Sequence, residues 1–338
     1  MKKITINDIA KALSVTPSTV SRALAGNTRV SIKTRNLVNE KAREMGYQPN
    51  VIAASLRKGK SDTVGMIVPR VNRHFFSNVI SGVEEILNPA GYNLVICQSG
   101  ENAFKEEKAV ETLLRNQVGG IILSLSVQTQ SYEHLEEVVR RGIPLVQFDR
   151  INPAIPGAKV INDNYTGAYL ATKHLLKSGY KRVAHFAGER KIKAYQERYE
   201  GYLKAMNEAG HDLDQGLLFE NIITRQAGNA TIKQVLEEGI ADAVFCAGDY
   251  SALGALEGLK ETGVMVPDDF GIVGFANEPF AELMYPTLSS VEQNAFEIGN
   301  KAAAAMIKSI EGEAANDEFL VPTRLIVRQS SQKEQSDG

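Results

Sequence analysis

The chain has 338 residues, of which 43% are hydrophobic, and a formal net charge of −2 at pH 7. This length is too great for one typical core and predicts two or three domains. No apolar run approaches the roughly 18 residues of a membrane-spanning helix, and the basic N-terminus lacks the pattern of a signal peptide, so we expect a cytoplasmic protein rather than a membrane or exported one.

Charge is distributed unevenly along the chain. Residues 1–60 contain seven lysines and five arginines against three acidic residues, so this segment carries +9 and the other 278 residues carry −11. A cluster of basic residues in the sequence is often only a solvated surface of the folded protein. A basic segment ahead of an acidic body also fits a polyanionic partner for that segment alone.

The residues that most often carry metal or covalent chemistry are sparse. Cys97 and Cys246 lie far apart inside apolar runs, which predicts core packing in a reducing compartment. The five histidines show no HxH or HExxH spacing, and no phosphate-binding glycine loop or nucleophile motif occurs. We therefore expect no metal, no cofactor and no catalytic activity.

The first 24 residues predict two short helices joined by a tight turn. In Ile4–Leu13, apolar residues recur at helical spacing. Thr16 is a good N-cap and Pro17 suits the first helical position, so a second helix should start here and run to Leu24. This arrangement predicts a helix-turn-helix, although any pair of short amphipathic helices fits the same pattern.

The second helix separates apolar from polar residues. Val20, Ala23 and Leu24 can face inward. The face that is left outside consists of Pro17, Ser18, Thr19, Ser21 and Arg22. Hydroxyl groups bind phosphate oxygens, and an arginine can donate two hydrogen bonds to guanine in the major groove, so this face predicts contact with double-stranded DNA.

A third helix and a connector follow. Ser31 can cap a helix that runs to about Met45. Its inward residues should be Leu37, Val38, Ala42 and Met45. The next stretch, Val51–Lys60, is short and mildly apolar, and an isolated helix of this length is marginal in water. It would form only where DNA and a symmetry mate hold it; the alternative is a plain interdomain linker.

From Thr63 onward, continuous apolar runs alternate with amphipathic segments. The runs predict buried parallel strands at Val64–Val68, Leu94–Cys97, Gly120–Leu123, Leu145–Phe148, Val183–Phe186, Ala243–Cys246 and Gly271–Val273. Alternation of this kind predicts a doubly wound α/β sheet, and two such series in succession predict two lobes. Ala295–Ile310 then predicts a helix and Phe319–Val327 a strand, while residues 329–338 lack apolar side chains and are expected to be disordered.

Ligands of open α/β sheets bind beyond the carboxyl ends of the strands, and two lobes bring these ends together across a cleft. Polar and aromatic residues follow the predicted strands. They are Asn72, Arg73, His74, Phe75, Phe76, Ser124, Asp149 and Arg150 in the first lobe, Asp163 and Asn164 at the crossover, and Glu189, Arg198, Asp249 and Asn277 in the second lobe. Carboxylates, guanidinium groups and aromatic rings suit a polyhydroxylated ligand.

Four motifs near the N-terminus stand in a known order: ITINDIAKALSVTPSTVSRAL at 4–24, VSIKTR at 30–35, GYQPN at 46–50 and ASLRKGKSDTVG at 54–65. Together they closely resemble the LacI/GalR family of bacterial transcription regulators, and the likeness extends more loosely to about residue 328. The resemblance implies a small all-α helix-turn-helix head at 1–50, a hinge helix or linker at 51–61 and an α/β body at 62–328. That body, with two doubly wound parallel-sheet lobes, would resemble periplasmic sugar-binding proteins.

The resemblance also implies the division of the body. One lobe would comprise 62–162 with 292–321, the other 163–291 with 322–328, and crossovers near residues 162, 291 and 322 would join them. The residues implied to bind DNA are Thr5, Thr16, Pro17, Ser18, Thr19, Ser21, Arg22, Ser31, Thr34, Tyr47, Ala53, Leu56 and Arg57. Leu56 matches a leucine that the family wedges between base pairs in the minor groove, which bends the duplex.

In the cleft, the resemblance implies an effector site. Its expected residues are Phe75, Phe76, Ser124, Asp149, Arg198, Asp249 and Asn277. Arg198 matches an effector-binding arginine three residues ahead of a helix glycine, whereas Asp149 and Asp249 could instead cap helices or hold loops. The family's usual GFDD reads Gly274 to Asn277 (GFAN) here, and Gly248 stands where asparagine or serine is common. Because Asn277 can both donate and accept hydrogen bonds, the ligand can differ from the usual neutral sugars, and Arg198 with Arg73 makes an acidic sugar an option.

These features predict a homodimeric, sequence-specific repressor that binds a pseudopalindromic double-stranded DNA operator and responds to a small-molecule effector, a sugar or sugar acid. A tetramer, and activation instead of repression, are left open. The alternatives are control by a phosphorylated protein corepressor, a solute receptor without DNA binding, and an α/β enzyme that uses Asp149 and His185 on a small sugar or nucleotide.

Overall fold

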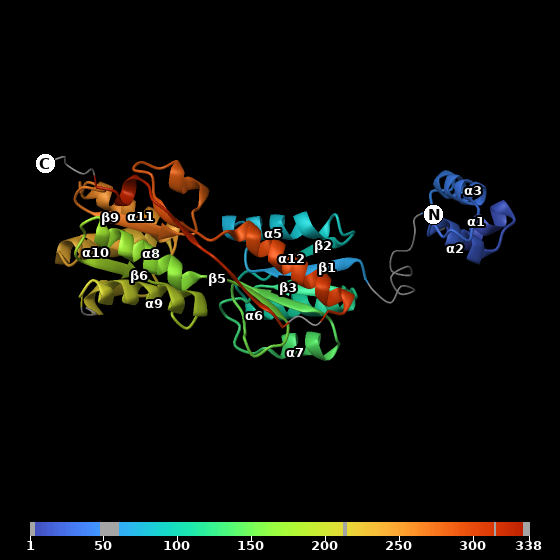
Figure 1. The fold of residues 1–338 in the computed structure, drawn as a ribbon, viewed down its shortest axis with the longest axis horizontal. Coiled ribbons are helices and arrows are strands. Elements are labelled where there is room, and N and C mark those ends of the chain that lie inside the picture. The colour runs from blue at the N-terminus through green and yellow to red at the C-terminus, as the bar shows by residue number, and fades with distance from the viewer. Residues whose placement is uncertain (1–3, 48–60, 212–214, 314–315, 334–338) are drawn as a thin grey trace. The chain divides into compact units, whose positions relative to one another are not determined.

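The computed structural model describes residues 4–47, 61–211, 215–313 and 316–333. The chain divides into two compact units, Met1–Ser61 and Asp62–Gly338. In Figure 1 the helices of the first unit are blue, and the second unit runs from light blue through green and yellow to red. The predicted connector at 51–60, with Ala53, Leu56 and Arg57, lies outside the described residues. None of the described helices is both long and apolar enough to cross a membrane.

The first unit is a bundle of three short helices, α1 (Ile6–Leu13), α2 (Pro17–Leu24) and α3 (Ile32–Glu44). A hydroxyl side chain starts each helix. Thr5 bonds with Asp8, Thr16 accepts a hydrogen bond from the Thr19 amide at 3.2 Å, and Ser31 accepts one from the Thr34 amide at 3.2 Å. The Thr16 and Ser31 caps satisfy amides that have no partner within the helix, and at α1 the Asp8 carboxylate accepts from the Thr5 amide at 2.8 Å.

The core of this unit is small and apolar, with Ile9, Val20 and Val38 fully buried. The prediction that Leu37 faces inward is wrong, because its side chain is 50% exposed. Val38 and Ala42, four residues apart, define the buried stripe of α3, and Leu37 lies about 100° around the helix from Val38.

The second unit contains two α/β lobes. The sheet of lobe 1 has the order β11-β5-β4-β3-β1-β2 with all pairs parallel. Its strands are β1 (Thr63–Val68), β2 (Asn93–Gln98), β3 (Gly120–Leu123), β4 (Leu145–Phe148), β5 (Ala158–Asn162) and β11 (Glu318–Val321). Two helices cover each face, as Figure 1 shows: α5 (His74–Leu87) with α12 (Ala295–Glu311), and α6 (Ala103–Arg115) with α7 (Glu133–Arg140).

The sheet of lobe 2 repeats this plan with the order β12-β10-β9-β8-β6-β7, in which only β12 runs antiparallel to its neighbour among the described strands. Its strands are β6 (Val183–Phe186), β7 (Leu218–Phe219), β8 (Ala243–Cys246), β9 (Gly271–Phe275), β10 (Ser289–Glu292) and β12 (Arg324–Ile326). Its helices are α8 (Asn164–Lys177), α9 (Lys193–Glu208), α10 (Arg225–Glu238) and α11 (Asp249–Glu261), with α8 packed on α9 and α10 on α11. The predicted doubly wound, two-lobed body is confirmed.

Three chain segments cross between the lobes: β5 to α8, β10 to α12, and β11 to β12. The predicted single strand Phe319–Val327 is wrong, because it is split between the two sheets at Pro322, which has no amide hydrogen to donate to a sheet. The crossovers bond to one another. Asn162 Nδ2 donates to the Gln293 carbonyl at 2.5 Å, and Thr323 Oγ1 donates to the Asp163 carbonyl at 2.9 Å.

Close helix packing in lobe 2 depends on a missing side chain at Gly201 of α9. A Cβ atom there would lie 2.2 Å from the Tyr165 carbonyl oxygen of α8, which is closer than two such atoms can approach. The backbones of α8 and α9 therefore lie close together, and Arg198, one turn before Gly201, reaches Asn164 at the start of α8.

The expectation that residues 329–338 are disordered is wrong for 329–333. Gln329–Ser331 forms a short 3-10 turn, and Ser330 and Ser331 are fully buried against lobe 2. Ser330 Oγ donates to the Ile272 carbonyl at 2.7 Å and accepts from the Ser289 amide at 2.8 Å. Polar residues can therefore be buried here because their hydrogen-bonding groups find partners in the sheet.

Candidate functional site

The N-terminal end of α2 carries a cluster of hydroxyl groups. Thr16 Oγ1 lies 2.8 Å from Ser18 Oγ and 2.9 Å from Thr19 Oγ1, while Val20 and Ala23 point into the core. Thr16, Pro17 and Ser18 are exposed. Hydroxyls at a helix N-terminus, where backbone amides also point outward, form a surface that suits phosphate oxygens.

Other predicted DNA-binding residues of the first unit occupy similar positions. Arg22 is exposed in the last turn of α2, and Ser21 is half-buried beside it. Ser31 Oγ and Thr34 Oγ1 form a second hydroxyl pair, 2.8 Å apart, at the start of α3, and Thr5 caps α1. Tyr47, in contrast, packs against the head core.

Sequence reasoning missed Arg35, which fixes the loop between α2 and α3. Its Nη1 atom donates to the Gly26 carbonyl at 3.1 Å. Nothing in the local pattern distinguishes this arginine from an exposed one, because its partner lies nine residues away.

The second unit holds a cavity of about 450 Å³ between its lobes. Of the residues predicted to bind an effector, Phe75, Phe76, Asp149, Arg198 and Asp249 line this cavity, and Ser124 and Asn277 do not. Its size is in the range of small-molecule sites, ~300 to 1,000 Å³.

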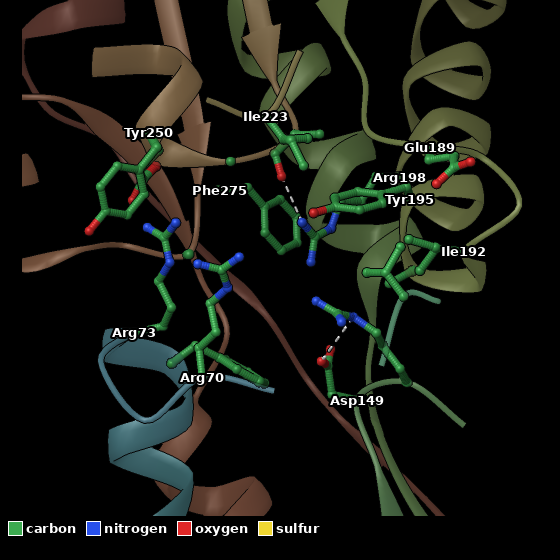
Figure 2. Close-up of a pocket in the computed structure, with 18 of the residues that line it drawn as sticks. Arg70, Arg73, Asp149, Glu189, Ile192, Tyr195, Arg198, Ile223, Tyr250 and Phe275 are labelled. Carbon is green, nitrogen blue, oxygen red and sulfur yellow. Dashed lines mark hydrogen bonds and ion pairs between the residues drawn. The ribbon is translucent and has the colours of Figure 1, made fainter. Parts of the chain in front are cut away.

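Arg198 is the most enclosed cation of the cavity. Its Nε donates to Asn164 Oδ1 at 2.9 Å and its Nη1 to the Ala247 carbonyl at 2.7 Å. The guanidinium carbon lies 3.7 Å from the centre of the Phe275 ring, so the group is clamped flat against an aromatic face (Figure 2). Burial lowers the pKa of Arg198, and the charge of Asp149 partly opposes this.

Asp149 faces Arg198 from lobe 1. It ends β4 in a left-handed backbone conformation with φ of 58°, and its carboxylate lies 3.9 Å from Arg150 Nε. Arg150 also donates to Glu101 at 2.6 Å. Burial raises the pKa of Asp149, although Arg150 and Arg198 both act to lower it.

Ser124 supports this group from behind. It is fully buried and donates to Asp149 Oδ2 at 3.4 Å, so it positions the carboxylate and does not reach the cavity.

Asp249 touches the cavity, but its carboxylate is occupied by the protein. Oδ1 accepts a hydrogen bond from Ser290 Oγ and Oδ2 one from the Glu278 amide, each at 2.7 Å. Burial raises the pKa of Asp249 to about 6, and these two bonds oppose that effect. This residue holds the loop after β9, which is the alternative role that the sequence left open.

The placement of Asn277 in the cleft is wrong. Its Nδ2 donates to Glu292 Oε2 at 2.8 Å and its Oδ1 accepts from Arg328 Nη2 at 2.9 Å, so both halves of the amide are satisfied away from the cavity. The preceding residue, Ala276, lines the cavity with a φ of 114°, and the chain turns outward directly after it.

Among the cleft residues that were not predicted, four stand out by their chemistry: Arg70, Tyr195, Tyr250 and Phe275. All four line the cavity, where Figure 2 shows them around one space with Arg73 and Arg198. Phe275 could have been found, because it is the last residue of β9 and strand ends face the cleft. Tyr195 and Tyr250 lie in the first turns of α9 and α11, inside helices and not at strand ends.

The described residues offer no group of three histidine, cysteine, aspartate or glutamate side chains that could hold a metal ion. His185, which the enzyme alternative would use, is fully buried between Tyr202 and Phe245, with ring centres 5.0 and 4.9 Å away. Burial lowers its pKa to about 4. It is a core residue of lobe 2 and does not line the cavity.

Comparisons with known proteins match both units. The profile of the bacterial regulatory proteins of the lacI family matches residues 5–50, and that of the periplasmic binding protein-like domain matches residues 172–331. The HTH-type transcriptional regulator DegA of Bacillus subtilis is 31% identical over 331 residues, which cover 97% of this chain and 98% of DegA.

Two solved structures illustrate the likeness in three dimensions. A complex of the transcriptional regulator CelR with cellobiose is 29% identical, covers 97% of this chain and 100% of that chain, and has a TM-score of 0.73. A Lac repressor dimer bound to operator and the anti-inducer ONPF is 23% identical, covers 98% and 100%, and has a TM-score of 0.87, so it shares the fold.

Proposed function

Because the chain belongs to the LacI family of bacterial transcription regulators, we propose that it is a dimeric repressor whose affinity for double-stranded operator DNA is controlled by a small molecule in the cleft. The main support for DNA binding is the exposed polar face of α2. This face presents Arg22 and the hydroxyl cluster, while Val20 and Ala23 of the same helix are buried. Such a regulator works in the cytoplasm, where bacterial DNA lies.

DNA recognition follows from the chemistry of this face. The hydroxyls of Thr16, Ser18 and Thr19 bind phosphate oxygens and set the orientation of α2, whereas Arg22 donates to base edges in the major groove. Two heads related by two-fold symmetry read the half-sites of a pseudopalindrome. The connector residues Ala53, Leu56 and Arg57 bind the minor groove, with Leu56 as the wedge.

A homodimer is supported by apolar side chains that are exposed to solvent on the surface of the second unit. Leu283 and Tyr285, in the loop after β9, are 82% and 86% exposed. Val95 and Ile96 are exposed on β2, which is an edge strand of lobe 1. Exposed apolar groups of this size on a single chain favour burial against a second copy.

Control by the ligand requires that it binds two arrangements of the lobes with different affinity. The three crossovers are the only connections between the lobes along the described backbone, so closing the cleft on a ligand rotates one lobe against the other about them. A coupling of this kind is worth ~1 to 3 kcal/mol, or ~5- to 150-fold in DNA affinity. A cavity of this size, lined by charged and aromatic side chains, favours a small molecule over a phosphorylated protein as the signal.

The test of DNA recognition is Arg22→Ala in the full chain, assayed by fluorescence anisotropy on a site selected from random duplex DNA. We expect a loss of about 1 to 3 kcal/mol on the selected site and little loss on random DNA, because a base contact specifies and a phosphate contact does not. The matched control is Arg43→Ala at the exposed end of α3, which removes the same charge and should change affinity for both DNAs alike. Equal losses on both DNAs for Arg22→Ala would make Arg22 a phosphate contact.

A further inference from the structure

Four arginines line the cleft, and their partners differ. Arg150 is neutralised, since it donates to Glu101 at 2.6 Å and lies 3.9 Å from Asp149. Arg198 bonds only neutral oxygens of Asn164 and Ala247 among its recorded partners in the described chain. The lobe 2 side of the cleft therefore presents an enclosed guanidinium without a bonded carboxylate.

Arg70 and Arg73 add two more cations from lobe 1. Both lie in the loop between β1 and α5, and Figure 2 shows their side chains extending into the cavity toward Tyr250 and Phe275. The Arg73 guanidinium stacks 4.1 Å above the Tyr250 ring. No carboxylate of the described residues lies within 4.0 Å of either guanidinium.

The acidic residues of the cavity are engaged elsewhere. Glu101 pairs with Arg150, and Glu189 pairs with Lys191 at 2.6 Å. The carboxylate of Asp249 accepts the Ser290 hydroxyl and the Glu278 amide. Glu278 is the exception: it also lines the cavity, where burial raises its pKa and the charge of Arg73 opposes this, without an ion pair between them among the described residues.

Three guanidinium groups that face one cavity repel one another, and the buried Arg198 has also lost much of its hydration. A ligand with anionic oxygens relieves both costs. The planar fork of arginine matches carboxylate and phosphate groups through two parallel hydrogen bonds. The remaining lining also suits hydroxyl groups and a sugar ring, because Asp149 can accept from hydroxyls and the rings of Phe75, Tyr195 and Phe275 offer apolar faces.

We propose that the cleft binds an anionic polyhydroxylated molecule, a sugar acid or a sugar phosphate, whose charged group is held by Arg70 and Arg73 while Arg198 binds its far end. This inference rests on the proposed function, because it takes the cleft to be the effector site. It replaces the reasoning from Asn277, whose amide is turned away from the cavity. Neutral sugars would leave the lobe 1 arginines without a partner.

The test uses neutral sugars and their charged derivatives. D-Glucose, D-gluconate, D-glucuronate and D-glucose 6-phosphate, with their galactose and mannose counterparts, are titrated into the full chain by calorimetry at constant ionic strength. We expect at least one acid or phosphate to bind more than 30-fold tighter than its neutral counterpart. A carboxylate is distinguished from a phosphate by pH, since only phosphate binding strengthens between pH 5 and 7 as its second proton, with a pKa near ~6, is lost.

Two variants connect this preference to the named residues. Arg70→Gln combined with Arg73→Gln should reduce binding of the charged probe by 10- to 100-fold and bring it close to that of the neutral sugar. Arg182→Gln, an exposed arginine at the opposite end of β6, should change nothing. Retained preference in the double variant would overturn the assignment, as would stronger binding of a neutral sugar or failure of every charged probe to bind.

DNA binding is measured in the same samples by anisotropy, so that the two proposals fail separately. A chain that binds DNA and prefers a neutral sugar overturns the anionic ligand and leaves the regulator. A chain that binds a charged probe but no DNA overturns the regulator and leaves the ligand class.

Discussion

The two units of this chain satisfy their polar side chains over very different distances. In the head, the hydroxyl of Thr16 bonds groups within three residues, and so do those of Thr5 and Ser31. In the body, Asp249 bonds residues 29 and 41 positions away, and Asn277 bonds Arg328 across 51 positions. The head's polar groups are also exposed, whereas Asp249 and Ser330 are buried.

This difference has an energetic consequence. An exposed hydroxyl that loses its partner can bond to water, so its loss costs little. A buried donor or acceptor that loses its partner has no replacement and costs ~1 to 3 kcal/mol. The body should therefore be sensitive to single polar substitutions that the head tolerates, and three substitutions test this in order of expected size.

Asp249→Asn should have the largest effect, which is a change in how the free energy of unfolding depends on pH. Burial raises the pKa of Asp249 to about 6, above its ordinary value of about 3.9, so the folded chain holds a proton that the unfolded chain releases between these values. The stability that this proton contributes is complete below about pH 4 and is lost as pH rises through 6, a change of about 3 kcal/mol.

The free energy of unfolding in urea is measured for the wild type and for Asp249→Asn at intervals from pH 4 to 7. The difference between the two proteins at each pH gives the contribution of Asp249. The asparagine can still accept from the Glu278 amide and donate to Ser290, so the fold is kept. Parallel pH profiles for the two proteins would show that Asp249 titrates as an ordinary exposed carboxyl.

Ser330→Ala should cost about 2 kcal/mol in the free energy of unfolding. It leaves the Ser289 amide without an acceptor inside lobe 2 and removes a bond to the Ile272 carbonyl. Ser81→Ala is the matched control, because Ser81 is exposed on α5 and bonds only within its helix; a change within about 0.5 kcal/mol is expected. Equal unfolding curves for both variants would mean that residues 329–333 are not held against lobe 2 in solution.

Thr16→Ala should have the smallest effect, about 1 kcal/mol on the stability of the head, because it removes the N-cap of α2. Hydrogen exchange of the α2 amides measures it directly, and the amides of lobe 2 serve as the internal control. A loss of several kcal/mol would show that the head depends on this group as the body depends on Ser330, and the comparison between the units would fail.

The same contrast explains what could be predicted from the sequence. The three head helices follow from Thr16, Pro17 and Ser31, because caps and apolar spacing act within a few residues. Most parallel strands follow from continuous apolar runs that are buried on both faces. The prediction that Leu94–Cys97 is a buried strand is wrong, because β2 is an edge strand on which Val95 and Ile96 are exposed. Asp149 follows from a general rule about strand ends and Arg198 from family resemblance, and the structure places both at the cavity.

Features that depend on distant partners could not be predicted. Asn277 looked like a ligand-binding residue because nothing in its neighbourhood reveals Arg328, which takes its side-chain oxygen. The serines at 330 and 331 looked like a polar tail because their partners lie in β9 and β10. Arg70 was overlooked because an exposed arginine after a strand gains meaning only when the other lobe closes the cavity around it.

The most direct test of the whole account is the affinity of the full chain for its selected operator, measured by anisotropy with and without a saturating cleft ligand from the calorimetric panel. We predict that the ligand changes the dissociation constant by ~5- to 150-fold in the wild type. Arg198→Ala should bind the same operator as tightly as the wild type and show no response. An operator affinity that is the same in the presence and absence of bound ligand would contradict the account.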